Sequence, residues 1–289
     1  MKRMSGRAKI VLTVVLAMVA FLIVNYVYSQ DAEYSNEAWL SRLERDSSYI
    51  GKKAAMALEF DKSPPGAWGE FIKGVDEDLV ARNKNIALTF DACGGLHGDG
   101  YDRELIQFLE ENAVPATLFI SGKWIDANRE TFDELATKAL FGIENHGLNH
   151  RPCSVDGESA YGIKGTLDVS DAFDEIEANE RKIEALTGRR PKYYRSSTAF
   201  TDEACTRIAG ALGVQVVSFD VLSGDAVPNV ATSVLVENIV SGTRPGSIII
   251  MHMNHPEWNG YEALVRVIPQ LREKGYSFVK LEDYPLKGQ

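Results

Sequence analysis

From residue 85 onward, short apolar runs alternate with longer stretches of helical periodicity, and this alternation restricts the fold more than any other feature of the sequence. The runs are rich in β-branched and aromatic residues and have the length of buried strands: 86–90, 115–120, 141–145, 192–195, 214–219, 246–251 and 276–280. Between most of them, apolar residues recur with the 3.6-residue period of a helix, at 102–113, 125–138, 168–187, 201–212, 231–241 and 261–274. Strands that alternate with helices predict an α/β fold with a parallel sheet, either open or curled into a (β/α) barrel.

The first 29 residues form a separate segment. A predominantly apolar run over 10–28 follows four basic residues, as in an export signal. Its 19 residues are also just enough to span a hydrocarbon core of ~30 Å. Because Val27-Tyr28-Ser29 is a mediocre cleavage site, a signal peptide and an uncleaved signal anchor both remain open. In either case we expect an exported body that is periplasmic, on the cell surface or secreted, with an inner-membrane anchor if the segment is retained.

The charge of the chain is divided unevenly between this segment and the rest. Against 31 Lys and Arg stand 41 Asp and Glu, a net charge of −10. Because the first 29 residues hold four basic residues and no acidic one, the other 260 residues carry −14. Such an acidic body repels a phosphate backbone, which argues against nucleic acid as a partner.

Residues 30–84 are polar and mixed, unlike the rhythmic part that follows. They contain a predicted helix over 36–58 and a break at Ser63-Pro64-Pro65-Gly66. We expect them to form a juxtamembrane segment that packs on a single domain over 85–289, whose ~200 residues suit one domain.

Polar residues suited to chemistry stand at the ends of five predicted strands: Asp91, His146, Arg195, Asp220 and His252. In a (β/α) barrel, the carboxyl ends of the strands meet on one face, where active sites are built. His146 and His150 are four residues apart, so on a helical turn both imidazoles project to one side and can share a metal ion.

Three cysteines, Cys93, Cys153 and Cys205, allow at most one internal disulfide. Export permits such a bridge. Cys93 and Cys153 flank the motifs around Asp91 and His150, so we expect the bridge to join these two; buried thiols are the alternative.

The ordered set of motifs resembles the polysaccharide deacetylases, the NodB-homology group of carbohydrate esterase family four. The matching residues are Thr89-Phe90-Asp91, His146 with His150, Arg195, Asp220 to Asp225, and Ile250-Met251-His252. The resemblance covers roughly residues 84–285. It implies a deformed (β/α) barrel of about seven strands and a divalent metal, usually zinc, held by the two histidines and polarising an N-acetyl carbonyl and its attacking water.

The resemblance also implies a role for the other matching residues. Asp91 corresponds to the base that takes a proton from water, and Arg195 to the arginine that orients this base. His252 corresponds to the acid that protonates the leaving amine. Asp225, or alternatively Asp220, corresponds to the carboxylate that tunes the acid histidine.

The first motif departs from the family pattern. Members normally carry a second aspartate directly after the catalytic one, as third metal ligand, but here that position is Ala92. Either Asp99 or His97 in the following glycine-rich loop replaces it, with Asp99 as our assignment, or Asp91 moves onto the metal, or the site binds metal weakly or not at all.

The substrate groove departs as well. Ser196-Ser197-Thr198 follows Arg195 and Ala226 follows Asp225, where the family usually has proline and aromatic residues. We expect Ser196, Trp124 and Trp258 to contact substrate, although both tryptophans suit a packing role equally.

Two classes of function follow from these residues. The first is metal-dependent hydrolysis of N-acetyl groups on an envelope or extracellular glycan of GlcNAc type, such as peptidoglycan, with deformylation or deacylation of a lipid-linked sugar as a variant. The second is a degenerate relative that binds glycan without hydrolysing it. Ala92 favours the second, whereas a base, an acid and their orienting partners together favour the first.

Overall fold

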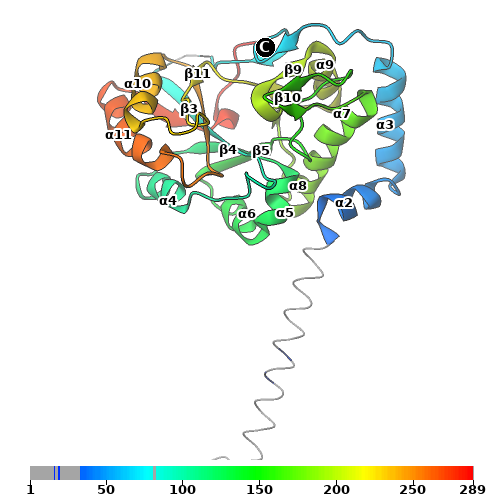
Figure 1. Cartoon of the computed structure of the whole chain (residues 1–289), viewed down its shortest axis with the longest axis horizontal. Helices are drawn as coiled ribbons and strands as arrows, with labels where there is room; N and C mark the ends of the chain where they lie inside the picture. Colours follow the sequence, from blue (N-terminus) through cyan, green and yellow to red (C-terminus); the bar gives the residue numbers. More distant parts are fainter. Residues whose placement is uncertain (1–15, 17–18, 20–32, 81–82, 289) are drawn as a thin grey trace, which may run out of the picture.

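The computed structural model describes Leu16, Val19 and residues 33–80 and 83–288 (Figure 1). The predicted leader over 1–29 therefore lies almost entirely outside the described residues. Within those residues, none of the helices has both the length and the apolar character needed to span a bilayer.

A sheet of nine strands, paired in parallel throughout, forms the centre of the molecule. Its main path runs in the order β11-β12-β3-β4-β5-β8-β10-β2, and β13, off this path, pairs with the first three residues of β3. All seven predicted strands are present, and β2 and β11 are additional. The bounds are β2 (Val75–Asp76), β3 (Asn85–Ala92), β4 (Ala116–Ile120), β5 (Phe141–Asn145), β8 (Tyr193–Tyr194), β10 (Gln215–Val217), β11 (Val221–Leu222), β12 (Ile248–His252) and β13 (Ser277–Val279).

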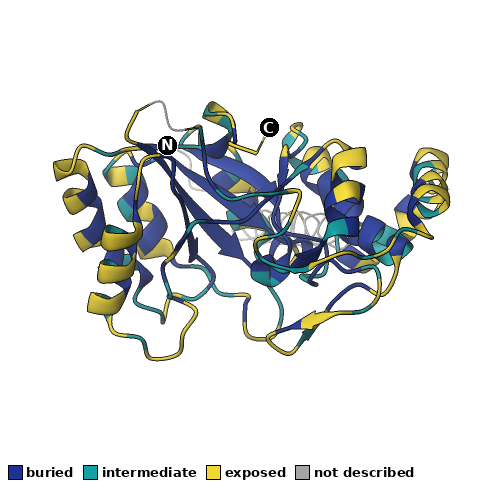
Figure 2. Cartoon of the chain, turned by 90° about the horizontal axis from the view of Figure 1, so that it is seen from above, coloured by how far each residue is buried: buried dark blue, intermediate teal, exposed yellow. Residues whose placement is uncertain are grey.

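The sheet curls into a half-barrel. β10 and β11 are separated in the chain only by residues 218–220, yet β11 is the first strand of the order and β10 is the second to last. Every residue of β3, β4 and β5 is buried, which explains why these strands read as near-continuous apolar runs. Figure 2 shows the buried strands flanked by helices whose outer surfaces are exposed. The expected α/β class with a deformed barrel is confirmed.

Helices follow the strands as predicted, but two of them are divided. The helix expected over 125–138 is two helices that meet at Asn128, whose side-chain amide donates to the carbonyls of Asp99 and Trp124. The helix expected over 168–187 contains one π-helical turn, η1. The bounds are α4 (Arg103–Glu111), α5 (Gly122–Ala127), α6 (Arg129–Ala136), α7 (Val169–Phe173), η1 (Asp174–Ala178), α8 (Asn179–Thr187), α9 (Glu203–Leu212), α10 (Thr232–Gly242) and α11 (Gly260–Glu273).

The segment before β3 packs along one side of the domain, where α2 (Asn36–Leu43) and α3 (Ser47–Phe60) lie near α7 and α8 (Figure 1). The single helix expected over 36–58 is divided because Asp46 caps the amino end of α3 with its side chain. Trp39 and Tyr49 are buried in the same apolar cluster as Phe173. The segment also contributes β2 to the main sheet, so it is integrated with the domain.

Short elements complete the surface around the barrel. β1 (Trp68–Gly69) pairs antiparallel with β9 (Thr201–Asp202), and β6 (Ser159–Ala160) pairs antiparallel with β7 (Ile163–Lys164). Two 3-10 turns follow β8 and β13, η2 (Ser197–Ala199) and η3 (Leu281–Asp283).

The predicted Cys93–Cys153 disulfide is wrong. Cys153 is bonded to Cys205, which lies in the first turn of α9, with Cα atoms 6.0 Å apart. Cys93 is the free cysteine of the described chain. The bridge fixes the segment that follows His150 to the outer helix layer.

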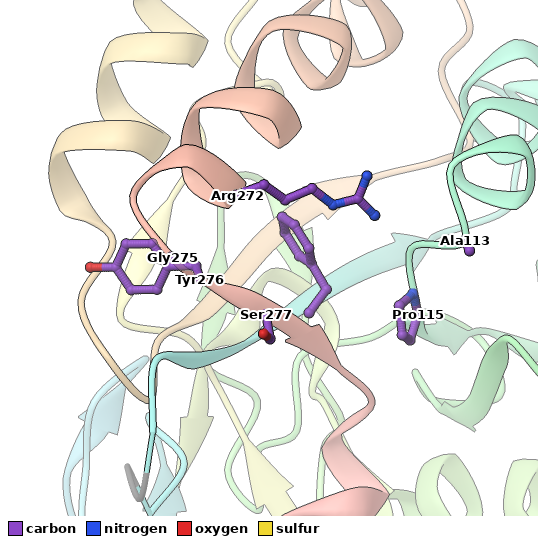
Figure 3. Close-up of a pocket in the computed structure, with 7 residues that line it drawn as sticks. Ala113, Pro115, Arg272, Gly275, Tyr276 and Ser277 are labelled. Carbon is purple, nitrogen blue, oxygen red and sulfur yellow. The ribbon is translucent and has the colours of Figure 1, made fainter.

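A pocket of about 390 Å³ lies at the edge of the sheet from which the strands start (Figure 3). It is lined by residues just before β4, by residues just before and within β13, and by Arg272, whose guanidinium donates to the Asn112 carbonyl. None of its seven lining residues is His, Cys, Asp or Glu. The pocket lies at the opposite edge of the sheet from the strand ends that carry the predicted site residues, and it is not part of the candidate site.

Candidate active site

Asp91 and Arg195 form a fully buried ion pair at the end of the barrel. Asp91 is the penultimate residue of β3, and Arg195 directly follows β8. Arg195 Nη1 lies 2.8 Å from Asp91 Oδ1 and 3.0 Å from Thr89 Oγ1. Its other nitrogens donate to the carbonyls of Val217 and Ser218, and its guanidinium carbon lies 4.1 Å from the centre of the Phe119 ring. Hydrogen bonds and the Phe119 ring thus hold the Arg195 side chain in place, and Arg195 in turn holds Asp91.

His146 directly follows β5 and points its Nε2 toward Asp91. The ring Nδ1 lies 2.9 Å from the carbonyl oxygen of Arg195, which can only accept a hydrogen bond, so Nδ1 carries the proton. In the neutral ring, Nε2 then has a free lone pair. Nε2 lies 3.6 Å from Asp91 Oδ2 and 4.0 Å from Cys93 Sγ.

Among the described residues, Cys93, His146 and His150 lie close enough together to bind one metal ion. One ligand atom from each lies within 4.8 Å of the other two. Two neutral imidazoles and a thiolate are a donor set that zinc accepts, and three protein ligands are the number found in catalytic zinc sites. The residues present therefore fit a divalent metal.

Glu175 in η1 holds the loop that carries the two histidines. Its carboxylate accepts the backbone N–H groups of Asn149 and Arg151, at 3.0 Å each. These bonds fix the turn in which His150 adopts a φ of 54°, a left-handed conformation. Burial raises the pKa of Glu175 to about 7, although the two backbone donors oppose this shift.

His252 ends β12 directly beside Asp91, since the two residues are partners in the strand register. His252 Nδ1 lies 3.0 Å from Asp225 Oδ1, and Asp225 Oδ2 accepts the backbone N–H of His252 at 2.6 Å. The alternative partner, Asp220, lies elsewhere: it accepts hydrogen bonds from Ser247 and the N–H of Ile248, at the start of β12. Of the two candidate carboxylates, Asp225 is therefore the one that contacts the histidine.

The electrostatics separate the protonation states of these groups. Burial disfavours the charged form of Asp91, but Arg195 and the neighbouring imidazoles outweigh it and lower its pKa. Burial likewise opposes the protonation of His252, but Asp225 raises its pKa well above the usual value. For Cys93, the histidines outweigh burial and hold the pKa of the thiol well below its ordinary range.

The third ligand expected from the sequence is not found at the histidines. Asp99 is exposed, outside the metal-spaced group, and accepts the backbone N–H of Gly95 in its own loop. His97 is exposed as well. Cys93 lies there instead, and the sequence held a signal for it: residues two apart along a strand point to the same face, so Cys93 follows Asp91 toward the site.

The predicted substrate contacts differ in their access to solvent. Trp124 has no exposed surface, and its indole N–H donates to the Gly100 carbonyl, so it cannot stack on a sugar. Ser196 is buried and links Cys153 N–H to the Phe200 carbonyl. Trp258 is partly exposed, with its ring 5.5 Å from that of His252 and stacked on His255. Only Trp258 thus combines exposure with contact to the site.

Comparison with known proteins relates part of this chain to a family. Residues 78–217 match the family model described as polysaccharide deacetylase. The chain is 26% identical to the uncharacterized protein YlxY of Bacillus subtilis over 81% of its length, and it spans 64% of that relative. It is 27% identical to a peptidoglycan-N-acetylglucosamine deacetylase of Bacillus cereus, covering 68% of this chain and 66% of the relative.

A solved structure of similar fold is that of a CE4 family pseudoenzyme from Bacillus anthracis. It superposes with a TM-score of 0.60 at 21% identity and covers 72% of this chain and 67% of that one. Residues 78–217 of the chain match a polysaccharide deacetylase domain.

Proposed function

We propose that this protein is an exported, metal-dependent deacetylase that hydrolyses N-acetyl groups on an envelope or extracellular glycan of GlcNAc type. One observation carries the proposal: a buried carboxylate paired with arginine and a histidine paired with carboxylate face each other across adjacent strands, beside a group of metal ligands. Hydrolysis of an amide needs these functions together, since water must lose a proton and the leaving nitrogen must gain one.

Asp91 is the base in this proposal. Its lowered pKa keeps it ionised at neutral pH, so it can accept a proton from the attacking water. Arg195 is a positioning residue, because it holds Asp91 Oδ1 and leaves Oδ2 toward His146. The metal, for which we propose zinc held by His146 and His150, supplies Lewis-acid polarisation of the acetyl carbonyl and of the water.

His252 is the acid in this proposal. Its raised pKa keeps the imidazolium protonated near neutral pH, and its Nδ1 is engaged by Asp225. The free ring nitrogen, Nε2, is then the one that donates a proton to the amine as the carbon–nitrogen bond breaks. Trp258 beside His252 offers an apolar face to the sugar ring.

A glycan-binding protein without hydrolytic activity is the second candidate. Ala92 favours it, because a methyl group cannot ligate a metal at the position where the family has its second aspartate. Binding alone, however, gives no reason to keep Asp91 and Arg195 buried together at the cost of desolvating two charges.

Acetate release from a GlcNAc oligomer by the metal-replete protein, measured together with its metal content, tests the proposal. We expect stoichiometric metal and turnover in the wild type, and loss of turnover with unchanged metal content in His252→Ala. A protein that holds metal and binds the oligomer but releases no acetate would be the glycan-binding candidate. Loss of metal in His252→Ala would show that His252 is a ligand and not the acid.

A further inference from the structure

We propose that the Cys93 thiolate completes the metal site with His146 and His150, one position further along the chain than the aspartate that Ala92 replaces. This ligand set deepens the proposed function, and it rests on that function only in taking a divalent metal as the cofactor. It makes the site a thiolate centre, which selects thiophilic ions of the zinc and cobalt type over magnesium, calcium and manganese.

The three ligand atoms are already close to the separations that a bound metal ion requires. The three ligand atoms lie within 4.8 Å of one another, and Cys93 Sγ is 4.0 Å from His146 Nε2. Tetrahedral coordination with metal–nitrogen and metal–sulfur bonds of ~2.0–2.3 Å separates ligand atoms by roughly 3.3–3.6 Å. Small side-chain rotations close that difference.

The backbone around Cys93 is fixed in place. The carbonyl of Cys93 accepts a hydrogen bond of 2.6 Å from Ser121 Oγ, at the amino end of α5. Gly94, which follows, has a φ of +76° and lies so close to α5 that a Cβ would collide with the backbone nitrogen of Trp124. The chain therefore turns sharply after Cys93 and holds the thiol toward the histidines.

The alternatives within the described residues are engaged elsewhere. The Ala92 side chain belongs to the main apolar core cluster, and Cys153 and Cys205 are bonded to each other. Asp91 Oδ1 is held by Arg195, and Oδ2, 3.6 Å from His146 Nε2, is the oxygen that the proposed function uses as the base. Cys93 is thus the anionic ligand of the first motif that remains available beside His146 and His150.

His146 is oriented to bind a metal ion together with Cys93. Nδ1 of His146 donates to the Arg195 carbonyl, which leaves Nε2 toward Cys93. Such an outer hydrogen bond fixes the tautomer and orientation of a metal-binding histidine. Three protein ligands leave a fourth position for water or substrate, and Asp91 lies next to the group, with Oδ2 3.6 Å from His146 Nε2.

Cobalt substitution of the purified full-length protein under non-reducing conditions tests the assignment. With one equivalent of Co²⁺, we expect an intense near-ultraviolet thiolate-to-cobalt charge-transfer band in the wild type and none in Cys93→Ser. Zinc affinity, measured by competition with a chelator, should fall in Cys93→Ser by more than the ~10–100-fold that follows loss of a ligand's hydrogen-bond partner. An unchanged band or unchanged zinc affinity in Cys93→Ser would overturn the proposal.

Two further variants keep the test decisive. Cys93→Asp should bind cobalt without the charge-transfer band, which separates loss of sulfur from loss of folding. Asp99→Asn is the matched control at the loop aspartate, and it should keep both the band and the wild-type affinity. Loss of metal in Asp99→Asn would contradict the proposal in favour of the loop carboxylate.

The test of the Cys93 ligand and the test of the deacetylase activity can fail independently of each other. A protein that shows the band and releases no acetate retains the Cys93 ligand and refutes the deacetylase. A protein that releases acetate in a metal-dependent way without the band retains the deacetylase and refutes the Cys93 ligand.

Discussion

The buried residues Asp91 and Arg195 should be strongly coupled, so that replacing both costs less unfolding free energy than the sum of the two single replacements. Both side chains are almost wholly excluded from water, at 3% and 0% exposure. Replacing Arg195 with Met leaves the carboxylate unpaired in the interior, which costs about 4 kcal/mol of unfolding free energy. Asp91→Asn keeps the hydrogen-bond acceptor and removes its charge, at a cost of about 2 kcal/mol.

The double variant Asp91→Asn/Arg195→Met should lose only about 3 kcal/mol, because no unpaired charge remains and the chief loss is the donor to the carbonyls of Val217 and Ser218. The coupling energy is then about 3 kcal/mol, at the upper end for directly contacting residues. Urea unfolding followed by far-ultraviolet circular dichroism measures all four corners of the cycle, provided that the m-value stays constant.

The exposed pair of Arg42 and Glu33, with side chains 55% and 51% exposed, is the matched control. The cycle of Arg42→Met and Glu33→Gln should give a coupling below ~1 kcal/mol. If the buried pair couples no more strongly than this exposed pair, the account of Arg195 as the group that keeps Asp91 ionised and in place is wrong.

Three further measurements address other parts of the molecule. Burial raises the pKa of Glu144 to about 8, so the folded state holds a proton that the unfolded state loses above ~4.5, and stability falls as pH rises between these values. In Glu144→Gln, the decline of unfolding free energy between pH 5 and 8, measured by thermal unfolding, should be smaller by roughly 1 kcal/mol per pH unit. An unchanged slope would refute the raised pKa of Glu144. Asp225→Asn removes the charge that raises the pKa of His252. Because the acid is active only while protonated, the alkaline limb of the pH–rate profile for acetate release should move to lower pH. An alkaline limb at unchanged pH would show that another group controls it. Cys153→Ser/Cys205→Ser, which opens a bridge across a sequence separation of 52, should cost up to about 4 kcal/mol of unfolding free energy in urea, with no loss in Arg42→Met as comparison.

The parts of the fold and site that the sequence predicted are those with strong local signals. All seven predicted strands are present, and strands such as β3 and β12 were recognisable because nearly all of their residues are buried. Asp91, Arg195, His146 and His252 come together because the carboxyl ends of parallel strands share one edge. β2 and β11 are two-residue strands that lie outside the seven apolar runs, so the sequence did not predict them.

The errors arose where the outcome depends on contacts distant in sequence. Cys153 pairs with Cys205 because β9 and α9 bring the latter beside the loop after His150, a placement that the spacing of three cysteines cannot specify. Trp124 was expected near substrate, but the strand-to-helix turn directs its indole inward to Gly100. Asp99 and His97 were the candidates for the third ligand, but both are exposed and lie outside the group formed by Cys93, His146 and His150.

The pairing of Cys153 with Cys205 has a consequence for the order of events in biosynthesis. If the chain crosses a membrane with its amino end first, Cys93 and Cys153 reach an oxidising compartment before Cys205 does. The first partner available to Cys153 is therefore Cys93, and a disulfide between these two would have to be resolved by thiol–disulfide exchange before Cys153 pairs with Cys205. A metal ion that captures Cys93 with His146 and His150 would withdraw this thiol from exchange, so maturation of the protein should depend on metal supply as well as on a disulfide isomerase.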